Sequence, residues 1–534
     1  MDSGFPRPQT GPTSCSTHRH PCPSWTRPRR PMSAPESAPP TRPPAPELRG
    51  APSPRLHNED LAPRRDAAPW RTWDLFCWWM SAWHSLGSYT FAIGLLVLGL
   101  TGWQVVVALV LGIAVLLWGC NLTGVAGQRA GVPFPVFARL SFGVFGANVP
   151  ALLRAVVGVA WYGIQTYLAS LAVMTMTLKV WPASQSLTAP QFLGMSALGW
   201  ICFLVLWTLQ LAVLHRGMEA VRKLSDVAGP VLWIAIAALA VWVLARAGWS
   251  VDWNYREGPA LDTAGTVSAI VSGAFLTVAF LAGPMLNFAD FSRNSPDARS
   301  IRRGNGLGLL VNGTAFVLVS VVIALASAEV HGQAVTDPVE LVQDIDSVTL
   351  LLLATVSIAG SAVGINIILN FVSPAYDFAN VAPSRISFRT GGVITAVVAL
   401  VVMPWRLYSS PVMVNYFIGG VGALIGPVFG IVVADYYLLR RGRIDVDDLY
   451  SDSPTGRYWY RRGTNPNAIA ALLVAGTITL LVAFLPALSA LAAYSWLVGT
   501  VIGGGAYLLA ERVHPSGSLL PEPAAVPAQL PTQR

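Results

Sequence analysis

The stretch DLFCWWMSAWHSLGSYTFAIGLLVLGL at residues 74–100 is apolar enough to cross a lipid bilayer, yet the residues SLGS at 85–88 interrupt its middle. A second apolar stretch, VSAIVSGAFLTVAFLAGPMLNFA at residues 267–289, is interrupted by AGP at 282–284. Glycine loosens a membrane helix and proline removes one of its backbone hydrogen bonds, so each interruption predicts a broken helix. Broken membrane helices at matching positions in two halves of a chain indicate a transporter built from inverted repeats.

Ten further apolar runs of similar length follow the same pattern of apolar stretch and polar connection. Backbone polar groups cannot stay unsatisfied in lipid, so runs of ~20 residues form helices there. Proline also occurs inside other runs, at Pro230 and Pro427, so simple kinks are the alternative to true breaks. We expect an all-α polytopic membrane protein in which helices 1 and 6 are equivalent members of two five-helix repeats. The twelve predicted transmembrane helices are residues 74–100, 103–125, 147–177, 193–214, 226–247, 267–289, 306–328, 347–371, 390–405, 413–438, 467–486 and 490–511.

The composition of the chain excludes a soluble protein. Of its 534 residues 53% are hydrophobic and 12% are charged, and the usual charged fraction is about 25%. The net charge of +8 does not indicate a nucleic-acid partner, because ten of the Arg residues lie in residues 1–65 and not on a folded face. The five cysteines form no CxxC pair, which excludes a zinc ribbon or a disulfide scaffold.

Three segments follow from the distribution of proline, charge and apolar runs. Residues 1–65 hold 16 of the 40 prolines and show no apolar periodicity, which predicts a disordered Pro/Arg-rich arm. Residues 66–512 form the helical domain, and residues 513–534 form a short disordered tail. Seventeen Lys and Arg lie in the loops after even-numbered spans, and only a few lie in the other loops. By the positive-inside rule both termini are expected in the cytoplasm, with the helices in the cell membrane.

The predicted spans carry no recognisable catalytic apparatus. Their cores contain no carboxylate, and Asp74, Asp290, Asp377 and Asp435 are expected at or near span ends. The sequence has no intramembrane HExxH motif, no Gly-rich phosphate loop and no Ser/His/Asp set. We therefore predict a carrier or channel and not an enzyme or an ATP-driven pump, with no cofactor and no metal.

The third run places an aromatic and an amide side chain on one helix face. Trp161 and Gln165 are four residues apart and therefore lie one turn from each other. An indole can stack on a planar heterocycle, and the neighbouring carboxamide can both donate to and accept from it. The alternative is a tryptophan of the interfacial belt and a glutamine that joins two helices.

Helices 1 and 8 contribute the other polar residues inside spans. Asn366 and Asn370 share one face of helix 8, and two amides in an apolar span need a partner helix or a ligand. His84 adjoins the break in helix 1, where an ionisable group indicates a function such as proton transfer. The alternative is a neutral imidazole that donates to a carbonyl. Arg154, near the start of helix 3, is expected to snorkel toward the membrane surface.

Four longer segments carry a family resemblance. They are GVPFPVFARLSFGVFGANVPALLRAVVGVAWYGIQTYLAS at 131–170, GPMLNFADFSR at 283–293, NFVSPAYDFANVAPSRISFRTGG at 370–392 and GPVFGIVVADYYLLRRGRIDVDDLY at 426–450. Between residues 58 and 512 the chain resembles the nucleobase:cation symporter-1 family, whose bacterial members carry nucleobases, hydantoins and allantoin.

This resemblance implies two inverted five-helix repeats plus two additional helices, with substrate bound midway between helices 1, 3, 6 and 8. The family's stacking tryptophan and its neighbouring amide match Trp161 and Gln165. Its substrate-facing asparagine on helix 8 matches Asn370, with Asn366 one turn before it.

Two departures from the family pattern concern the aromatic sandwich and the cation. Leu281 stands where the sodium-coupled hydantoin carrier of the family has a second tryptophan, and Phe280 is the candidate to supply the missing aromatic face. Gly364 and Ile365 stand where that carrier has adjacent Ser and Thr ligands for sodium. Ser361 could supply one oxygen only, and a hard cation needs several.

The sequence therefore predicts a secondary active importer of a small planar nucleobase or ureide, such as uracil or allantoin. His84 is the leading candidate for a proton-coupling residue, and Ser361 is a tentative second one. The segments around residues 79–85 and 283–288 resemble the allantoin and uracil permease branch. The alternatives are a sodium-coupled hydantoin- or cytosine-type carrier, an amino-acid carrier that binds a carboxylate at residues 85–88, or a ligand sensor. The expected partners are the substrate and the lipid bilayer, with the chain acting as a monomer.

Overall fold

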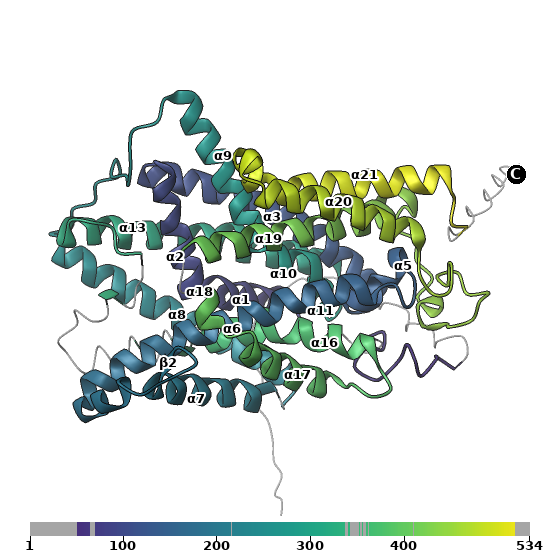
Figure 1. Ribbon diagram of the computed structural model, residues 1–534, viewed down its shortest axis with the longest axis horizontal. Helices are drawn as coiled ribbons and strands as arrows, with labels where there is room; N and C mark the ends of the chain where they lie inside the picture. The colour runs from purple at the N-terminus through teal and green to yellow at the C-terminus, as the bar shows by residue number, and fades with distance from the viewer. Residues whose placement is uncertain are drawn as a thin grey trace, which may run out of the picture. The chain divides into compact units, whose positions relative to one another are not determined.

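The chain is folded almost entirely as helices in the part that the computed structural model describes (Figure 1). Most of the predicted N-terminal arm and of the C-terminal tail lies outside that part. The described residues are 51–64, 70–214, 216–336, 340–341, 352, 355, 359–360, 362–408 and 411–517.

The first half of the helical domain covers predicted helices 1 to 5 and a short antiparallel strand pair. Its elements are α1 Thr72–Trp83, α2 Leu86–Gly94, η1 Leu95–Leu98, α3 Gly102–Ala130, α4 Phe134–Phe137, α5 Arg139–Phe142, α6 Asn148–Val180, η2 Pro182–Thr188, β1 Gln191–Phe192, β2 Met195–Ser196, α7 Ala197–Leu214 and α8 Met218–Arg246.

The second half covers predicted helices 6 to 10, and its described residues contain three π-helical segments, η3, η4 and η5. Its elements are α9 Thr263–Phe280, α10 Ala282–Asn287, α11 Ala289–Ser292, α12 Ala298–Asn305, η3 Gly306–Asn312, α13 Gly313–His331, η4 Asn366–Phe371, α16 Val372–Val381, α17 Phe388–Val401, α18 Pro404–Tyr408, α19 Pro411–Val433 and η5 Ala434–Leu439.

The last helices lie beside α19, where Figure 1 shows them as adjacent green and yellow ribbons. These elements are η6 Asp447–Tyr450, α20 Pro466–Phe484, η7 Pro486–Tyr494 and α21 Ser495–Val513.

The lengths and compositions of the helices confirm an all-α membrane class. Within the described residues nine helical stretches are long and apolar enough to cross a membrane, and three shorter apolar helices accompany them at Gly87–Leu98, Ala197–Val213 and Phe388–Val401. Each of the twelve predicted ranges overlaps one of these stretches. Three of these twelve helical stretches are shorter than the nine that could cross a membrane, so the count of twelve spans stays a prediction.

The first predicted break is present between α1 and α2. The backbone leaves helical geometry at His84 and is extended at Ser85, with φ −136° and ψ 157°. The Ser85 hydroxyl then accepts a hydrogen bond from the Ser88 backbone N–H at 3.0 Å, which caps the start of α2. Ser85 and Ser88 therefore act here as a helix cap.

The second predicted break separates α9 from α10. Helix α9 ends at Phe280, and the next residue, Leu281, has a φ of −107° and a ψ of 16°, which depart from helical values. Pro284 has no N–H, so it cannot donate to the carbonyl of Phe280 one turn earlier. Within α10 the proline occupies the first turn, where a missing donor costs little. The AGP motif thus ends one helix and begins the next.

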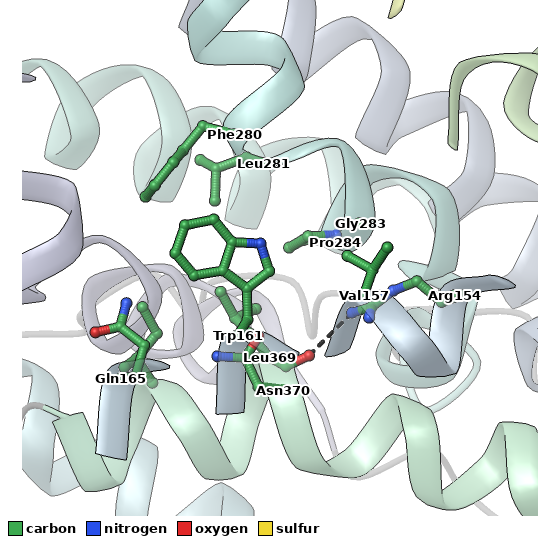
Figure 2. Close-up of a pocket in the computed structure, with 11 residues that line it drawn as sticks. Arg154, Val157, Trp161, Gln165, Phe280, Leu281, Gly283, Pro284, Leu369 and Asn370 are labelled. Carbon is green, nitrogen blue, oxygen red and sulfur yellow. Dashed lines mark hydrogen bonds between the residues drawn. The ribbon is translucent and has the colours of Figure 1, made fainter. Parts of the chain in front are cut away.

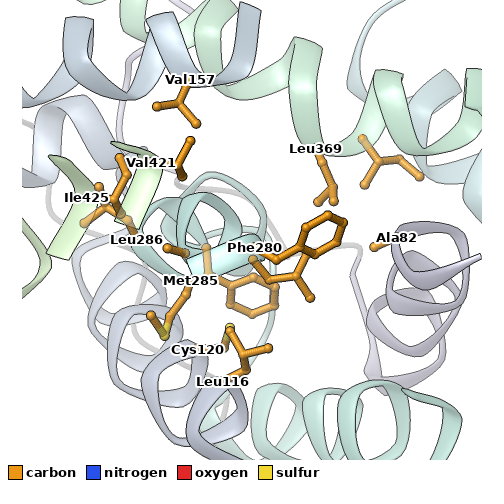
Figure 3. Close-up of a cluster of buried hydrophobic side chains, with 14 of the residues drawn as sticks. Ala82, Leu116, Cys120, Val157, Phe280, Met285, Leu286, Leu369, Val421 and Ile425 are labelled. Carbon is orange, nitrogen blue, oxygen red and sulfur yellow. The ribbon is translucent and has the colours of Figure 1, made fainter. Parts of the chain in front are cut away.

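The broken helix α9–α10 packs closely on α3. A Cβ atom on Gly112 would lie 2.6 Å from the Ala274 carbonyl, and one on Gly119 would lie 2.2 Å from the Met285 sulfur. Small residues permit such close approach between membrane helices. Figure 3 shows Cys120 of α3 among the apolar side chains around this contact, and its thiol is free and buried.

Residues 51–64 differ from the predicted disordered arm, because they pack against the helical domain. Leu61 is 0% exposed, and its carbonyl accepts a hydrogen bond from the Tyr450 hydroxyl at 2.6 Å. The Asp60 carboxylate accepts from the Phe388 backbone N–H at 2.8 Å. Average composition does not register a few well-placed anchoring residues such as these.

Candidate functional site

A cavity lies where the break between α9 and α10 faces α6 and the π-helical segment η4 (Figure 2). Its volume is about 20 Å³, which accommodates a water molecule but not a six-membered ring. A ring can enter only if side chains or helices move. The residues that line it are Arg154, Val157, Trp161, Gln165, Phe280, Leu281, Gly283, Pro284, Ile365, Leu369 and Asn370.

Trp161 of α6 stands in the middle of this site, between the α9–α10 break and η4 in Figure 2. Its indole meets Phe280 edge-on, with ring centroids 5.1 Å apart and planes at 79°. On another side it meets Phe417 edge-on at 5.2 Å. Phe280 in turn stacks on Phe91 of α2 at 4.6 Å and 14°. Aromatic rings therefore contact the half-buried indole on two sides, and aromatic surfaces suit the stacking of a planar ligand.

The two candidates for the second aromatic face, Phe280 and Leu281, both line the cavity. Phe280 supplies an aromatic ring, but its present edge-on angle to Trp161 is not that of a sandwich. For a ring to stack between them, Phe280 would have to turn away from its contact with Phe91.

Gln165 lies one turn from Trp161 on the same wall, as the spacing predicted. Its side chain is 2% exposed, and its Oε1 has no hydrogen-bond partner among the residues that the structure describes. A buried acceptor without a donor costs about 1–3 kcal/mol. Gly87 in α2 makes room for this amide, because a Cβ there would lie 2.8 Å from Gln165 Nε2. The cavity thus presents an unused acceptor.

Asn370 and Asn366 form a chain of amides on η4. Asn370 lines the cavity, and its Nδ2 donates to Asn366 Oδ1 at 3.0 Å. Asn366 lies behind it and donates to the Tyr162 carbonyl at 3.1 Å and to the Thr166 hydroxyl at 2.9 Å. Asn366 therefore holds Asn370 in place and does not itself reach the cavity wall.

His84 does not join these residues. It is buried at the break, edge-on to Trp233 of α8 at 4.8 Å and tilted against Phe316 of α13 at 5.1 Å. His84 is not among the residues that line the cavity. Its adjacency to the break in the sequence did not bring it to the cavity.

The predicted cation-coupling residue Ser361 lies outside the described residues. The two positions that match sodium ligands in the resembled carrier are described. Ile365 is buried and lines the cavity with an aliphatic side chain, and Gly364 has no side chain.

Arg154 lines the cavity and does not have the position expected from the sequence. Its guanidinium is 1% exposed and does not snorkel. Nε donates to Asn287 Oδ1 at 2.9 Å, and Nη2 donates to the Leu369 carbonyl at 3.0 Å. A helix start near the membrane surface suggested snorkelling, but polar atoms on two neighbouring helices hold the side chain inside the protein.

Two of the aspartates expected near span ends lie close to Arg154. Asp290 is 0% exposed and accepts from the Phe134 backbone N–H at 2.7 Å and from Asn287 at 3.0 Å. Asp377 is also fully buried. We call Arg154, Asn287, Asp290, Ser373 and Asp377 the buried charge cluster. Asn287 joins it together, since it also donates to the Ser373 hydroxyl.

The chemistry that this arrangement supports is recognition of a small, flat, uncharged ring. An indole offers a stacking surface, while Gln165 and Asn370 offer carboxamide groups from two different helices. No group of three or more His, Cys, Asp or Glu that could hold a metal ion occurs in the described residues.

Known proteins resemble this chain in sequence and in fold. A sequence model of the family described as permease for cytosine/purines, uracil, thiamine and allantoin matches residues 64–499. The allantoin permease of Bacillus subtilis is 34% identical over 469 residues, covering 88% of this chain and 95% of that protein. The purine-uracil permease of Arabidopsis thaliana is 34% identical over 445 residues, covering 83% of this chain and 74% of that protein.

The fold is also that of a solved transporter structure. A nucleobase-cation-symport-1 family transporter, in a closed conformation with bromovinylhydantoin bound, aligns with a TM-score of 0.69. The alignment covers 87% of this chain and 98% of that chain at 23% identity. The matched family consists of permeases, so the chain is a multi-pass membrane transporter and not an enzyme. The chain belongs to the family of permeases for cytosine and purines, uracil, thiamine and allantoin, the nucleobase:cation symporter-1 family.

Proposed function

We propose that the chain is a secondary active importer of a small planar ureide or nucleobase such as allantoin or uracil, and that protons drive it. The observation that carries this proposal is the convergence of Trp161, Gln165 and Asn370 from two helices on one cavity beside the break in a third. These side chains suit a ring that stacks on the indole and bonds to two carboxamides.

An uncharged substrate is proposed because Trp161, Gln165 and Asn370 are uncharged side chains. The free Gln165 Oε1 would accept from a ring N–H, and the Asn370 carboxamide would bond to a neighbouring polar atom of the ring. Allantoin and uracil each carry adjacent C=O and N–H groups in a ureide unit. The named permeases of Bacillus subtilis and Arabidopsis thaliana support this class for the chain.

The proton is proposed as the coupling ion because the matched sodium positions have no side-chain oxygen. Gly364 and Ile365 cannot ligate a hard cation through their side chains, and sodium would lose two ligands there. The same proposal places the protein in the cell membrane as a monomer. Its termini are proposed to lie in the cytoplasm, in agreement with the Lys and Arg content of its loops.

Uptake by proteoliposomes tests the proposal. Radiolabelled uracil and radiolabelled allantoin should each be tried with an inward proton gradient, with an inward sodium gradient and with both gradients collapsed. We expect accumulation with the proton gradient and competition by unlabelled ureides, and no competition by leucine. Accumulation that follows sodium and ignores pH would favour the hydantoin-type alternative. Competition by leucine would indicate an amino-acid carrier, and binding without transport would indicate a sensor.

A variant of the amide adds a test of the site itself. Gln165→Glu would replace a neutral donor and acceptor with a carboxylate that is costly to bury. We expect severely weakened binding, whereas Gln185→Glu in the exposed segment η2 should leave uptake unchanged.

A further inference from the structure

The buried aspartates of the described chain differ in how their carboxylates are satisfied. Asp74 pairs with Arg222 at 2.7 Å, and Asp435 pairs with Arg440 at 3.0 Å. Asp290 accepts one backbone and one side-chain hydrogen bond. Each of these three therefore has donors that stabilise an ionised carboxylate.

Asp377 is the exception among them. It is 0% exposed, and neither of its carboxylate oxygens has a hydrogen-bond partner among the described residues. An ionised carboxylate without donors is strongly disfavoured in a water-excluded environment, whereas the neutral acid is tolerated. The surroundings of Asp377 therefore favour a bound proton in this conformation.

Arg154, on the neighbouring helix α6, carries a positive charge that acts on Asp377. Helices α6 and α16 touch at Gly158, where a Cβ would lie 2.4 Å from Pro374 and 2.7 Å from Arg154 Nη1. Pro374 precedes Asp377 by about one turn on the same helix face. Nη1 is itself buried without a partner among the described residues. The guanidinium and the carboxylate thus act on each other electrostatically without a hydrogen bond between them.

The other elements packed on α16 add few charges. Helix α11 presents Asp290, which repels an ionised Asp377. Arg293, at the end of α11, donates to the Tyr376 hydroxyl at 2.9 Å and acts on Asp290. Helix α17 carries Arg389, which is exposed, and neither α4 nor η4 carries an ionisable residue. Arg154 and Asp290 are therefore the charged side chains of these elements that interact with Asp377.

Arg154 also connects Asp377 with the substrate cavity. The same guanidinium lines the cavity and donates to the carbonyl of Leu369, the residue before Asn370. Movement of η4 around a bound ring would therefore change the position of the positive charge. A change in that position changes the proton affinity of Asp377.

We propose that Asp377 is the proton-binding residue of the transport cycle, and that Arg154 links its protonation to the substrate cavity. This inference rests on the proposed proton-driven function. While α6 and α16 are closed at Gly158, Asp377 is the neutral acid. When the helices separate and water enters, the O–H bond breaks, its electron pair stays on the oxygen, and the proton passes to water. The positive charge of Arg154 then stabilises the ionised carboxylate of Asp377.

The test compares Asp377→Asn with two control variants in proteoliposomes. Asparagine keeps the shape but cannot release a proton. Asp297→Asn is the matched control, because Asp297 is exposed and caps α12, and asparagine caps a helix equally well. Asp377→Glu keeps a titratable group. Radiolabelled uracil and allantoin serve as probes, in proton-driven accumulation and in exchange without a gradient.

For one proton per neutral substrate, each pH unit of gradient should support about tenfold accumulation by the wild type. We expect Asp377→Asn to exchange substrate but not to accumulate it, and the Asp297→Asn and Asp377→Glu variants to accumulate it. Accumulation by Asp377→Asn at the wild-type level would overturn the inference. If the wild type moved neither probe or ignored the proton gradient, the proposed function itself would fail.

A binding measurement covers the case in which Asp377→Asn loses exchange as well. Purified protein in weakly buffered detergent should change its bound protons when uracil or allantoin binds, and Asp377→Asn should not. The same proton change in wild type and variant would overturn the inference. His84→Asn, in a residue away from the cavity, should keep the wild-type change.

Discussion

Helix α6 carries two different kinds of polar group on either side of Trp161. One turn beyond it lies the neutral Gln165, and about two turns before it lies Arg154. Both are buried and both line the same cavity. In Figure 2 Gln165 lies to the left of Trp161, Arg154 lies to its right, and Asn370 lies below it.

The two groups differ in how much of their hydrogen bonding the protein itself uses. Gln165 Oε1 accepts no hydrogen bond from the described residues. Two of the three guanidinium nitrogens of Arg154 donate hydrogen bonds, to Asn287 and to the Leu369 carbonyl. A free neutral amide is available to a ligand, whereas a bonded cation is part of the scaffold. We therefore expect the amides to recognise the ligand, and the buried charge cluster to serve the stability of the fold and the proposed coupling.

The largest effect is expected from removing the cation. Arg154→Ala leaves the Asn287 and Leu369 acceptors without a donor and Asp290 with less compensation, which should cost ~3–5 kcal/mol of unfolding free energy. Thermal unfolding of the purified protein measures this. Lys223→Ala removes an exposed cation and should cost no more than ~1 kcal/mol. Equal melting temperatures for the two variants would remove the structural role given to Arg154.

Removing the stacking surface should affect binding more than stability. Trp161→Ala should weaken uracil or allantoin binding by ~1–3 kcal/mol, or about 5- to 150-fold. Trp161→Phe should retain a fraction, because a phenyl ring still stacks. Binding isotherms and melting curves on the same samples separate the two effects. If Trp161→Ala bound both probes as the wild type does, the assignment of this site would be wrong.

The amide chain can be divided into a contacting and a positioning residue. Asn370→Ala should cost ~1–3 kcal/mol of binding, because ligand groups lose their partner. Asn366→Ala should cost less, because it acts by holding Asn370 through their 3.0 Å hydrogen bond. A double-mutant cycle should show strong coupling between the two sites, with the double variant little worse than Asn370→Ala. Additive losses would show that Asn366 contacts the ligand independently.

The smallest effect is expected from a methyl group that fills the space beside Gln165. Gly87→Ala places a methyl group 2.8 Å from Gln165 Nε2 and should displace the amide, raising the KM several-fold. Gly94→Ala, in the same helix α2, meets nothing within 4 Å and should leave the KM unchanged. Because both changes favour the helix equally, the difference between them reports on the amide alone. Identical KM values would mean that Gln165 does not need its present position.

Much of the site could be predicted because its signals are local. The four-residue spacing of Trp161 and Gln165 fixes a shared helix face, and the SLGS and AGP motifs carry their own backbone consequences. The structure confirms both breaks and places both side chains on one cavity wall.

The remaining residues could not be placed from local signals. His84 lies beside a break in the sequence, yet it packs between Trp233 and Phe316. Arg154 lies near a helix start, where snorkelling is the common outcome, yet polar groups on two other helices hold it inside.

By itself, the sequence determined that this chain is a helical membrane protein, where two of its helices break, and which side chains share a helix face. Each of these depends on hydropathy, backbone chemistry and helical period within a few residues of the chain. Only the tertiary structure decided which face of each helix meets protein and which meets lipid. That choice depends on partners hundreds of residues away, such as Asp377 for Arg154, because in a bilayer hydrophobicity alone does not distinguish a neighbouring helix from a lipid tail.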